Sequence, residues 1–225
     1  MNNKLPKAVI FDWDNTLVDT WPLIHFAINE TMGKMDRELW HIDKVKTDIH
    51  KSMRESFPAL FGKRWQEAGE IYKNAYRNQH LEKMEFLSGA MEVINFLYQK
   101  KILLFVISNK MGNTLRIEAE NLKVSDKFFA IIGAGDAKFD KPHQAPVDLA
   151  LQGSNLDPKK DLIWFVGDTI TDIECAINSN CQPILYGKGA NVPQDLIAKE
   201  MVKKEKPMLC FDNHQEILEK LKSLN

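Results

Sequence analysis

Cysteine is scarce in this sequence of 225 residues, which contains three: Cys175, Cys181 and Cys210. An odd number without a Cys-x-x-Cys spacing excludes a disulfide framework and a cysteine-based zinc site. An excess of one charge is also missing, because 30 Lys and Arg residues balance 31 Asp and Glu residues. This balance excludes the basic surface of a typical nucleic-acid-binding protein and the composition of a disordered acidic tail.

Long hydrophobic runs are absent as well. The longest, such as Ile102–Ile107, fall far short of the ~18 apolar residues that a membrane span requires. The N-terminal residues reach Asp12 and Asp14 before the apolar region of a signal peptide could form. We therefore expect a soluble, cytoplasmic protein with neither nucleic acid nor membrane among its partners. The sequence does not indicate an oligomeric state.

Short apolar runs rich in β-branched and aromatic residues recur along the chain. Six of them are expected to be strands: Ala8–Phe11, Ile102–Ile107, Phe129–Ile132, Leu162–Val166, Pro183–Tyr186 and Met208–Phe211. Because these runs are apolar throughout, they suit strands that are covered on both faces. Segments with helical periodicity lie between them: Ala90–Lys100, Asn113–Leu122, Val147–Gln152, Asp172–Ser179, Gln194–Lys203 and Gln215–Leu224. This alternation predicts an α/β fold in which helices cover both faces of a parallel sheet.

The interval between Phe11 and Ile102 breaks this rhythm, because it is far longer than one crossover helix requires. A helix is expected to begin at Trp21-Pro22, and apolar residues recur at helical spacing from Trp65 to Tyr76. No strand-like run occurs in this interval. We therefore expect an α/β core of residues 1–18 and 88–225, and an all-helical insert of residues 19–87.

Two acidic clusters follow predicted strands. Asp12 and Asp14 follow the first strand, and Asp168 and Asp172 follow Leu162–Val166. Ligands gather at the carboxyl ends of strands in open α/β sheets, so the two clusters are expected to lie close together. Carboxylates there can bind a hard cation, or divide the work of nucleophile and proton shuttle. The alternatives are an Asx turn for the first pair and helix N-capping for the second.

Two other strand ends carry groups that suit a phosphate. Ser108 and Asn109 follow Ile102–Ile107, where a hydroxyl and the next backbone N–H can hold phosphate oxygens. Lys141 follows Phe129–Ile132 after a loop and can neutralise a phosphate and an attacking carboxylate. A single serine or lysine in a loop is usually an ordinary surface residue. The pattern indicates a phosphate site only because all of these residues occur at successive strand ends.

This set of residues resembles the haloacid dehalogenase superfamily of aspartate-dependent phosphohydrolases. The matching motifs are Asp12-x-Asp14-x-Thr16, Ser108, Lys141-Pro142 and Gly167-Asp168-x-x-x-Asp172. The resemblance implies a Rossmann-like core with a helical cap inserted after the first motif. The chain is most similar to the phosphoglycolate-phosphatase group. It departs from that group at Ser88, where the group has Pro, at Gln144-Ala145, and at Trp13, where Leu or Met is common.

The resemblance also implies catalytic roles. Asp12 would be the nucleophile, and Asp14 would protonate the leaving oxygen and then activate water against an aspartyl-phosphate. Mg²⁺ would be held by the Asp12 side chain, the Asp14 backbone carbonyl and Asp168. Asp172 would be a supporting or alternate ligand of the metal.

Binding of the substrate is assigned to two further groups of residues. The phosphoryl group would be held by Thr16, Ser108, Asn109 and Lys141. The cap would choose the substrate, and Lys51 or Arg54 could bind a carboxylate or a second anionic group. The alternative for this pair is that both are solvated charges on a cap helix.

The sequence thus predicts a Mg²⁺-dependent phosphatase that acts on a small phosphorylated metabolite. A phosphomutase would keep the same residues, so it stays open as an alternative. A metal-independent haloacid dehalogenase is disfavoured, because that class lacks the second aspartate of the first motif. A binding module with a retired site is disfavoured by the intact set from Asp12 to Asp172. Phosphoglycolate, sugar phosphates and nucleotides all stay open as substrates.

Overall fold

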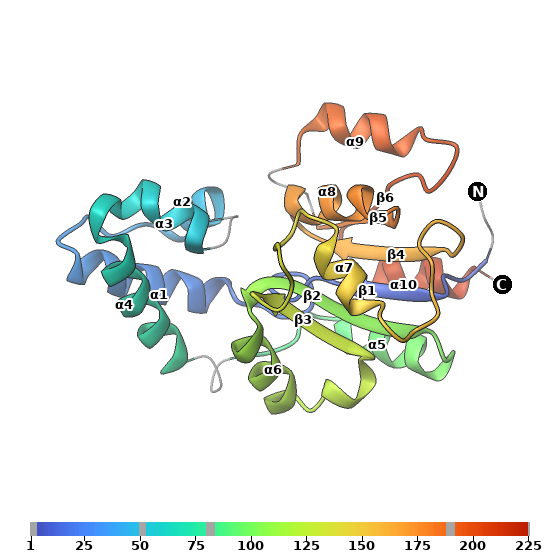
Figure 1. The fold of residues 1–225 in the computed structure, drawn as a ribbon, viewed down its shortest axis with the longest axis horizontal. Coiled ribbons are helices and arrows are strands. Elements are labelled where there is room, and N and C mark those ends of the chain that lie inside the picture. The colour runs from blue at the N-terminus through green and yellow to red at the C-terminus, as the bar shows by residue number, and fades with distance from the viewer. Residues whose placement is uncertain (1–3, 50–52, 80–83, 188–191, 225) are drawn as a thin grey trace. The chain divides into compact units, whose positions relative to one another are not determined.

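The computed structural model describes residues 4–49, 53–79, 84–187 and 192–224 (Figure 1). The chain divides into two compact units. The first, which we call the core, consists of Met1–Val18 and Phe86–Asn225. The second, the helical insert, consists of Asp19–Glu85.

The core contains a six-stranded parallel sheet in the order β3-β2-β1-β4-β5-β6. The strands are β1 (Ala8–Phe11), β2 (Leu103–Met111), β3 (Ala130–Ala134), β4 (Ile163–Gly167), β5 (Gln182–Tyr186) and β6 (Leu209–Phe211). The predicted α/β fold with a parallel sheet is confirmed. Successive strands run outward from β1 first through β2 and β3, and then through β4, β5 and β6. The order therefore reverses at β1, and the carboxyl ends of β1, β2 and β4 surround the position where such sheets bind ligands.

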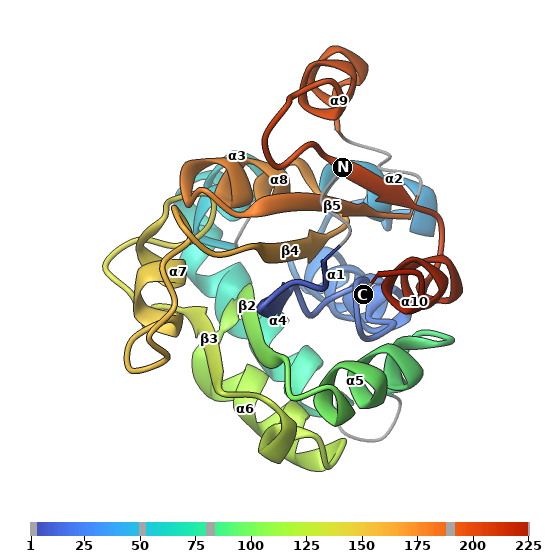
Figure 2. The same ribbon diagram turned by 90° about the vertical axis from the view of Figure 1, so that its right-hand side faces the viewer.

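Helices cover both faces of this sheet. They are α5 (Ala90–Gln99), α6 (Gly112–Asn121), α7 (Ala145–Ala150), α8 (Ile170–Asn178), α9 (Gln194–Met201) and α10 (His214–Lys222). Figure 2 shows α7 and α8 on one face of the sheet and α5 and α10 on the other. Ile10, Phe105 and Phe165 are aligned across β1, β2 and β4, and they form one buried cluster with residues of α7 and α8. Because both faces are covered, β1 and β4 are buried along their whole length, as their uninterrupted apolar sequences predict.

The ends of some elements differ from the sequence prediction. β2 continues to Met111, four residues beyond the apolar run, and its register with β3 shifts between Ile107 and Met111. Asn213 caps the last helix, because its side chain accepts a hydrogen bond from the Glu216 backbone N–H at 3.0 Å. The Glu216 side chain reaches back to the N–H of Asp212, one residue earlier than in a standard capping box.

The helical insert has a hydrophobic core of its own. Its helices are α1 (Trp21–Lys34), α2 (Ile42–Asp48), α3 (Met53–Phe61) and α4 (Trp65–Arg77). Their shared buried cluster consists of Ile28, Met32, Met35, Val45, Phe57, Phe61 and Ala68. Trp65, Ile71 and Tyr72 pack against this cluster, so the apolar stripe of α4 belongs to the interior of the insert.

The chain leaves and re-enters the core through two segments that pair with each other. Val18 and Phe86 form an antiparallel bridge, and the Leu87 N–H donates to the Leu17 carbonyl at 2.9 Å. Within the insert, the Asp19 N–H donates to the Glu85 carbonyl at 3.0 Å. Among the residues that the structure describes, no helix is both long enough and apolar enough to cross a membrane.

Candidate active site

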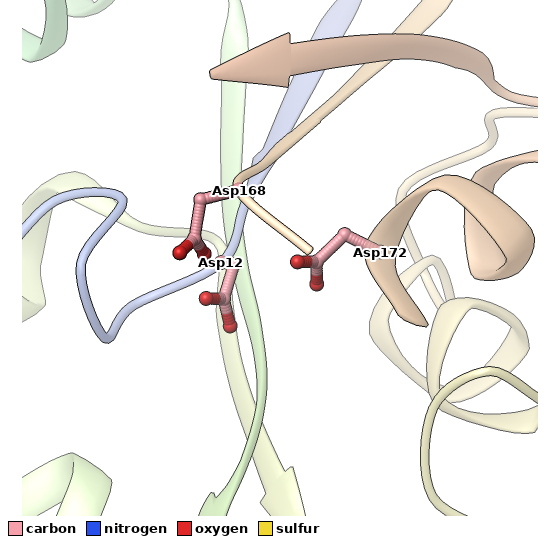
Figure 3. Close-up of side chains that lie close together, drawn as sticks. All are labelled: Asp12, Asp168 and Asp172. Atoms are coloured by element: carbon pink, nitrogen blue, oxygen red, sulfur yellow. The ribbon is translucent and has the colours of Figure 1, made fainter. Parts of the chain in front are cut away.

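Three aspartates converge at the carboxyl ends of β1 and β4. Asp12 directly follows β1, Asp168 directly follows β4, and Asp172 lies in the first turn of α8. Figure 3 shows their carboxyl groups gathered in one place, and one oxygen of each lies within 4.8 Å of the others. Because β1 and β4 are neighbouring parallel strands, residues 156 positions apart in the sequence meet at one sheet edge.

A capping box fixes the orientation of Asp172. Thr169 is the N-cap residue of α8, and Asp172 Oδ2 accepts hydrogen bonds from the Thr169 backbone N–H and hydroxyl at 3.0 and 2.6 Å. The alternative that Asp168 or Asp172 is itself the N-cap is therefore wrong, and α8 begins two residues earlier than predicted. Gly167 makes this turn possible, because a Cβ atom there would lie 2.3 Å from the Asp172 Cβ.

Lys141 joins two of these carboxylates. Its buried Nζ donates to Asp12 Oδ1 and to Asp172 Oδ1, at 2.6 Å in each case. Asn109 holds the lysine backbone from both sides, since its Nδ2 donates to the Lys141 carbonyl and its Oδ1 accepts from the Lys141 N–H. The Asn109 side chain therefore positions Lys141. Of Asn109, only the backbone N–H is left as a candidate for binding phosphate.

The three carboxylates carry more negative charge than the Lys141 ammonium group neutralises. Three carboxylates face one ammonium group, so two negative charges are left when all four are ionised. Burial raises the pKa of Asp12 to about 7, with Asp172 and Asp14 adding to the shift and Lys141 opposing it. Burial and the charges of Asp12 and Asp172 also raise the pKa of Asp168. Carboxylate oxygens in this number, with this charge, fit a divalent cation that prefers oxygen ligands, such as Mg²⁺.

Lys141 keeps its proton in this setting. Burial opposes the charge of its ammonium group, but Asp12 and Asp172 outweigh burial and raise its pKa above the ordinary value. The lysine is therefore a fixed positive charge next to the Asp12 carboxylate.

Thr16 and Ser108 both lie at this sheet edge and are buried. The Thr16 hydroxyl donates to Asp168 Oδ1 at 3.1 Å, so it orients that carboxylate. Ser108 lies where β2 and β3 lose their regular register, and its Oγ accepts from the Lys110 N–H at 3.2 Å. The predicted phosphate-binding role of Thr16 stays a prediction.

Two charged residues that were not predicted from the sequence, Lys110 and Glu118, form a network with Asp14. Lys110 Nζ lies 2.6 Å from Asp14 Oδ1 and 2.6 Å from Oε2 of Glu118 in α6. The Trp13 indole N–H donates to the same Glu118 oxygen at 2.8 Å. The one indication of this network in the sequence was Trp13, which is unusual at its position. A buried tryptophan N–H usually has a hydrogen-bond acceptor, so Trp13 implied an acceptor nearby.

The two remaining candidate residues belong to the helical insert. Arg54 belongs to α3, and Lys51 lies outside the described residues. The prediction that either residue binds substrate therefore stays a prediction.

A sequence model of the haloacid dehalogenase-like hydrolases matches residues 9–186, a range that contains every motif at the sheet edge. The chain belongs to this family. The predicted family membership is confirmed, and so is the prediction that the chain is a hydrolase.

Individual proteins are also similar to nearly the whole chain. A phosphoglycolate phosphatase of Pseudomonas fluorescens is 24% identical over 96% of this chain and 79% of its own length. The pyrophosphatase PpaX of Bacillus cereus is 24% identical over 97% of this chain and 98% of its own. The crystal structure of a hydrolase of the same superfamily from Ehrlichia chaffeensis is 32% identical, covers 98% of both chains and superposes with a TM-score of 0.67.

Proposed function

We propose that this protein is a Mg²⁺-dependent phosphatase that hydrolyses a small phosphate monoester through an aspartyl-phosphate at Asp12. One observation carries the proposal: the Asp12 carboxylate lies at the end of β1, bound by a buried lysine and next to two further carboxylates. Family membership and relatives named as phosphatases support the same reaction class.

The metal would be held by the side chains of Asp12 and Asp168 and by the backbone carbonyl of Asp14, with Asp172 as a supporting or alternate ligand. When bound, Mg²⁺ supplies positive charge that reduces the repulsion between a carboxylate and a phosphate anion. The two uncompensated negative charges of the cluster support a divalent ion in this place.

The first step is transfer of the phosphoryl group to Asp12. An oxygen of Asp12 attacks phosphorus, and the bond between phosphorus and the leaving oxygen breaks. Asp14 gives its proton to that leaving oxygen. Lys141 holds the attacking carboxylate and offsets its charge, while Ser108 and the Asn109 backbone N–H hold the phosphoryl oxygens.

The second step is hydrolysis of the aspartyl-phosphate. Asp14, now ionised, accepts a proton from a water molecule that attacks phosphorus. The bond between phosphorus and the Asp12 oxygen breaks, which releases phosphate and restores both aspartates. One carboxylate therefore acts as acid and then as base, and its position has to suit both steps.

We assign substrate choice to the helical insert, and we keep Lys51 and Arg54 as candidate contacts for a second anionic group of the substrate. Relatives named for phosphoglycolate and for pyrophosphate make both compounds the first to test. We place the protein in the cytoplasm, and its three free cysteines support a reducing compartment.

The purified protein should hydrolyse p-nitrophenyl phosphate with Mg²⁺ and lose this activity when the metal is chelated. A panel of phosphoglycolate, pyrophosphate, sugar phosphates and nucleotides should then identify the preferred substrate. Turnover of a haloacid without metal, or no turnover of any phosphate, would contradict the proposal. A phosphoenzyme that transfers its group to a sugar phosphate faster than to water would favour a phosphomutase instead.

A further inference from the structure

Four side chains form a closed ring of hydrogen bonds beside the cluster of Asp12, Asp168 and Asp172. Lys110 Nζ donates to Asp14 Oδ1 and to Glu118 Oε2, and the Trp13 indole N–H donates to the same Glu118 oxygen. Trp13 and Asp14 are consecutive in the chain, so the backbone between them closes the ring. The ring fastens the loop that follows β1 to the end of β2 and to α6.

The charges of this ring are buried. The Glu118 side chain is fully buried, and the Lys110 side chain is 8% exposed. Burial opposes the charge of Lys110, but Asp14 and Glu118 outweigh burial and raise its pKa. Buried charges persist only when they are paired in good geometry, and removing one partner is costly. Each member of the ring is therefore held in place by its neighbours.

The helix that carries Glu118 is itself tightly anchored. α6 begins at Gly112, directly after β2, and it packs on β2 and β3. At Gly133 in β3, an added Cβ would lie 2.4 Å from the Gly112 Cα, so the two backbones approach as closely as glycine permits. The position of Glu118 on the core is therefore fixed, and its hydrogen bond to Lys110 Nζ fixes the lysine side chain in turn.

We infer that Lys110 is a positioning residue for Asp14, and that Glu118 and Trp13 hold Lys110 in the position this requires. The inference rests on the proposed function, in which Asp14 acts on the leaving oxygen and then on water. A charged hydrogen bond of 2.6 Å fixes the direction of the Asp14 carboxylate. A displacement of about 1 Å in a reacting group can cost about 10²-fold in rate.

The expected defect is selective for the steps that use Asp14. A good leaving group such as p-nitrophenolate hardly requires a proton, so phosphorylation of Asp12 should be nearly unchanged in Lys110→Met. Hydrolysis of the aspartyl-phosphate still requires Asp14, so steady-state turnover should fall by about 10–10²-fold. Rapid mixing with p-nitrophenyl phosphate and Mg²⁺ should therefore show a burst of nitrophenol near one equivalent per site.

A double-mutant cycle separates positioning from general damage. If Lys110 acts through Asp14, adding Lys110→Met to Asp14→Asn should change turnover by less than about twofold. Equal losses in the burst and steady-state rates, or full additivity with Asp14→Asn, would overturn the inference. If the wild-type protein shows no Mg²⁺-dependent turnover, the proposed function is wrong as well. If the wild-type protein is active but Lys110→Met shows neither the burst nor the non-additivity with Asp14→Asn, only the inference is wrong.

Two milder variants keep the test valid if Lys110→Met does not fold. Glu118→Gln keeps the shape of the anchor while removing its charge, and Trp13→Phe removes the indole N–H. Each should show the same burst with a smaller loss of steady-state turnover. Glu120→Gln is the matched control, because Glu120 is exposed on the same helix, and it should behave like the wild type. If both ring variants fold and match this control, the inference is wrong.

Discussion

At the scale of single residues, the four aspartates of the site are distinguished by the groups that hold them. Asp12 accepts from Lys141, Asp14 from Lys110 and Asp168 from Thr16, whereas Asp172 accepts from both Thr169 and Lys141. Two of these donors are cations and two are hydroxyl groups. The proposed nucleophile and the proposed proton-transfer group therefore each accept from a lysine, Asp168 accepts from a neutral hydroxyl, and Asp172 accepts from donors of both kinds.

Thr16 provides a test of this division of roles. Thr16→Val removes the hydroxyl bonded to Asp168 while keeping the shape of the buried side chain. We expect Mg²⁺ affinity to fall by about 10–10²-fold, the usual cost of losing a group that orients a metal ligand. Thr16→Ser keeps the hydroxyl and should stay close to the wild type. Isothermal titration calorimetry with Mg²⁺ measures both variants, and equal affinity of Thr16→Val and wild type would contradict this role.

Some of these residues could be predicted from the sequence, and others could not, because their burial depends on tertiary packing. Asp12 and Asp168 directly follow apolar runs, so their place at a sheet edge was predictable from the strand pattern. Lys141 follows its strand only after a loop, and it was indicated by its combination with the other motifs. Glu118 lies in a helix and looks like an ordinary surface charge. Its burial depends on how α6 packs against the core, and no local pattern encodes that packing.

At the scale of elements, apolar runs indicated where the strands lie along the chain, but polar residues made some of the strand and helix ends unpredictable. β2 was expected to end at Ile107 because Ser108, Asn109 and Lys110 are polar. The backbone nevertheless continues as a strand to Met111, because strand pairing depends on the backbone rather than on side-chain polarity. The start of α8 was missed in the same way, since Thr169 rather than an aspartate caps it.

The first turn of α10 carries a buried histidine with consequences for stability. The His214 ring packs against Tyr186 of β5 with ring centroids 4.5 Å apart, and it is fully buried. Within the described part of the chain, neither ring nitrogen has a hydrogen-bond partner of normal geometry, although the backbones of Ser88 and Thr16 lie close enough to oppose part of the effect of burial on the pKa of the ring. Burial lowers the pKa of His214 from 6.5 to about 4. The folded protein therefore keeps this ring neutral, while the unfolded chain takes up a proton below pH 6.5.

This difference predicts that acid destabilises the fold through His214. The folded-state pKa is the lower one, so stability is fully present above about pH 6.5 and decreases as pH falls toward about 4. The loss at pH 4.5 should be about 2 kcal/mol. His214→Phe keeps the ring and removes the titration. Urea unfolding at pH 7.5 and 4.5 should show a smaller loss for the variant than for the wild type. Equal losses would show that other groups cause the acid sensitivity.

At the scale of the whole molecule, the core and the helical insert each have their own hydrophobic cluster. The chain leaves the core at Val18 and returns at Phe86, and these two residues pair with each other. A short connection could therefore close the core without the insert. The length of the interval, together with its helical periodicity, allowed the insert to be expected from the sequence. Its substrate contacts could not be read in the same way, because they depend on individual side chains.

Replacing residues 19–85 by a short Gly-Ser linker tests the proposed separation of chemistry and specificity. The shortened protein should unfold cooperatively and still hydrolyse p-nitrophenyl phosphate with Mg²⁺. Its preference for the best metabolite over p-nitrophenyl phosphate should fall by about tenfold or more, since pocket contacts supply discrimination of this order. Values of kcat/KM for both substrates measure the change. An unchanged preference would mean that the core itself chooses the substrate.

Attack by Asp12 is the central step of the proposed mechanism, and pre-steady-state kinetics of two variants test it directly. Asp14→Asn should lower steady-state turnover by about 10²–10⁴-fold, the usual range for one proton-transfer group. Because p-nitrophenolate leaves without a proton, rapid mixing of this variant with p-nitrophenyl phosphate and Mg²⁺ should release nearly one equivalent of nitrophenol per site. An acyl-phosphate should then be trapped at Asp12, whereas Asp12→Asn should show neither burst nor turnover. Retained activity in Asp12→Asn, together with no burst and no trapped acyl-phosphate in Asp14→Asn, would contradict the mechanism.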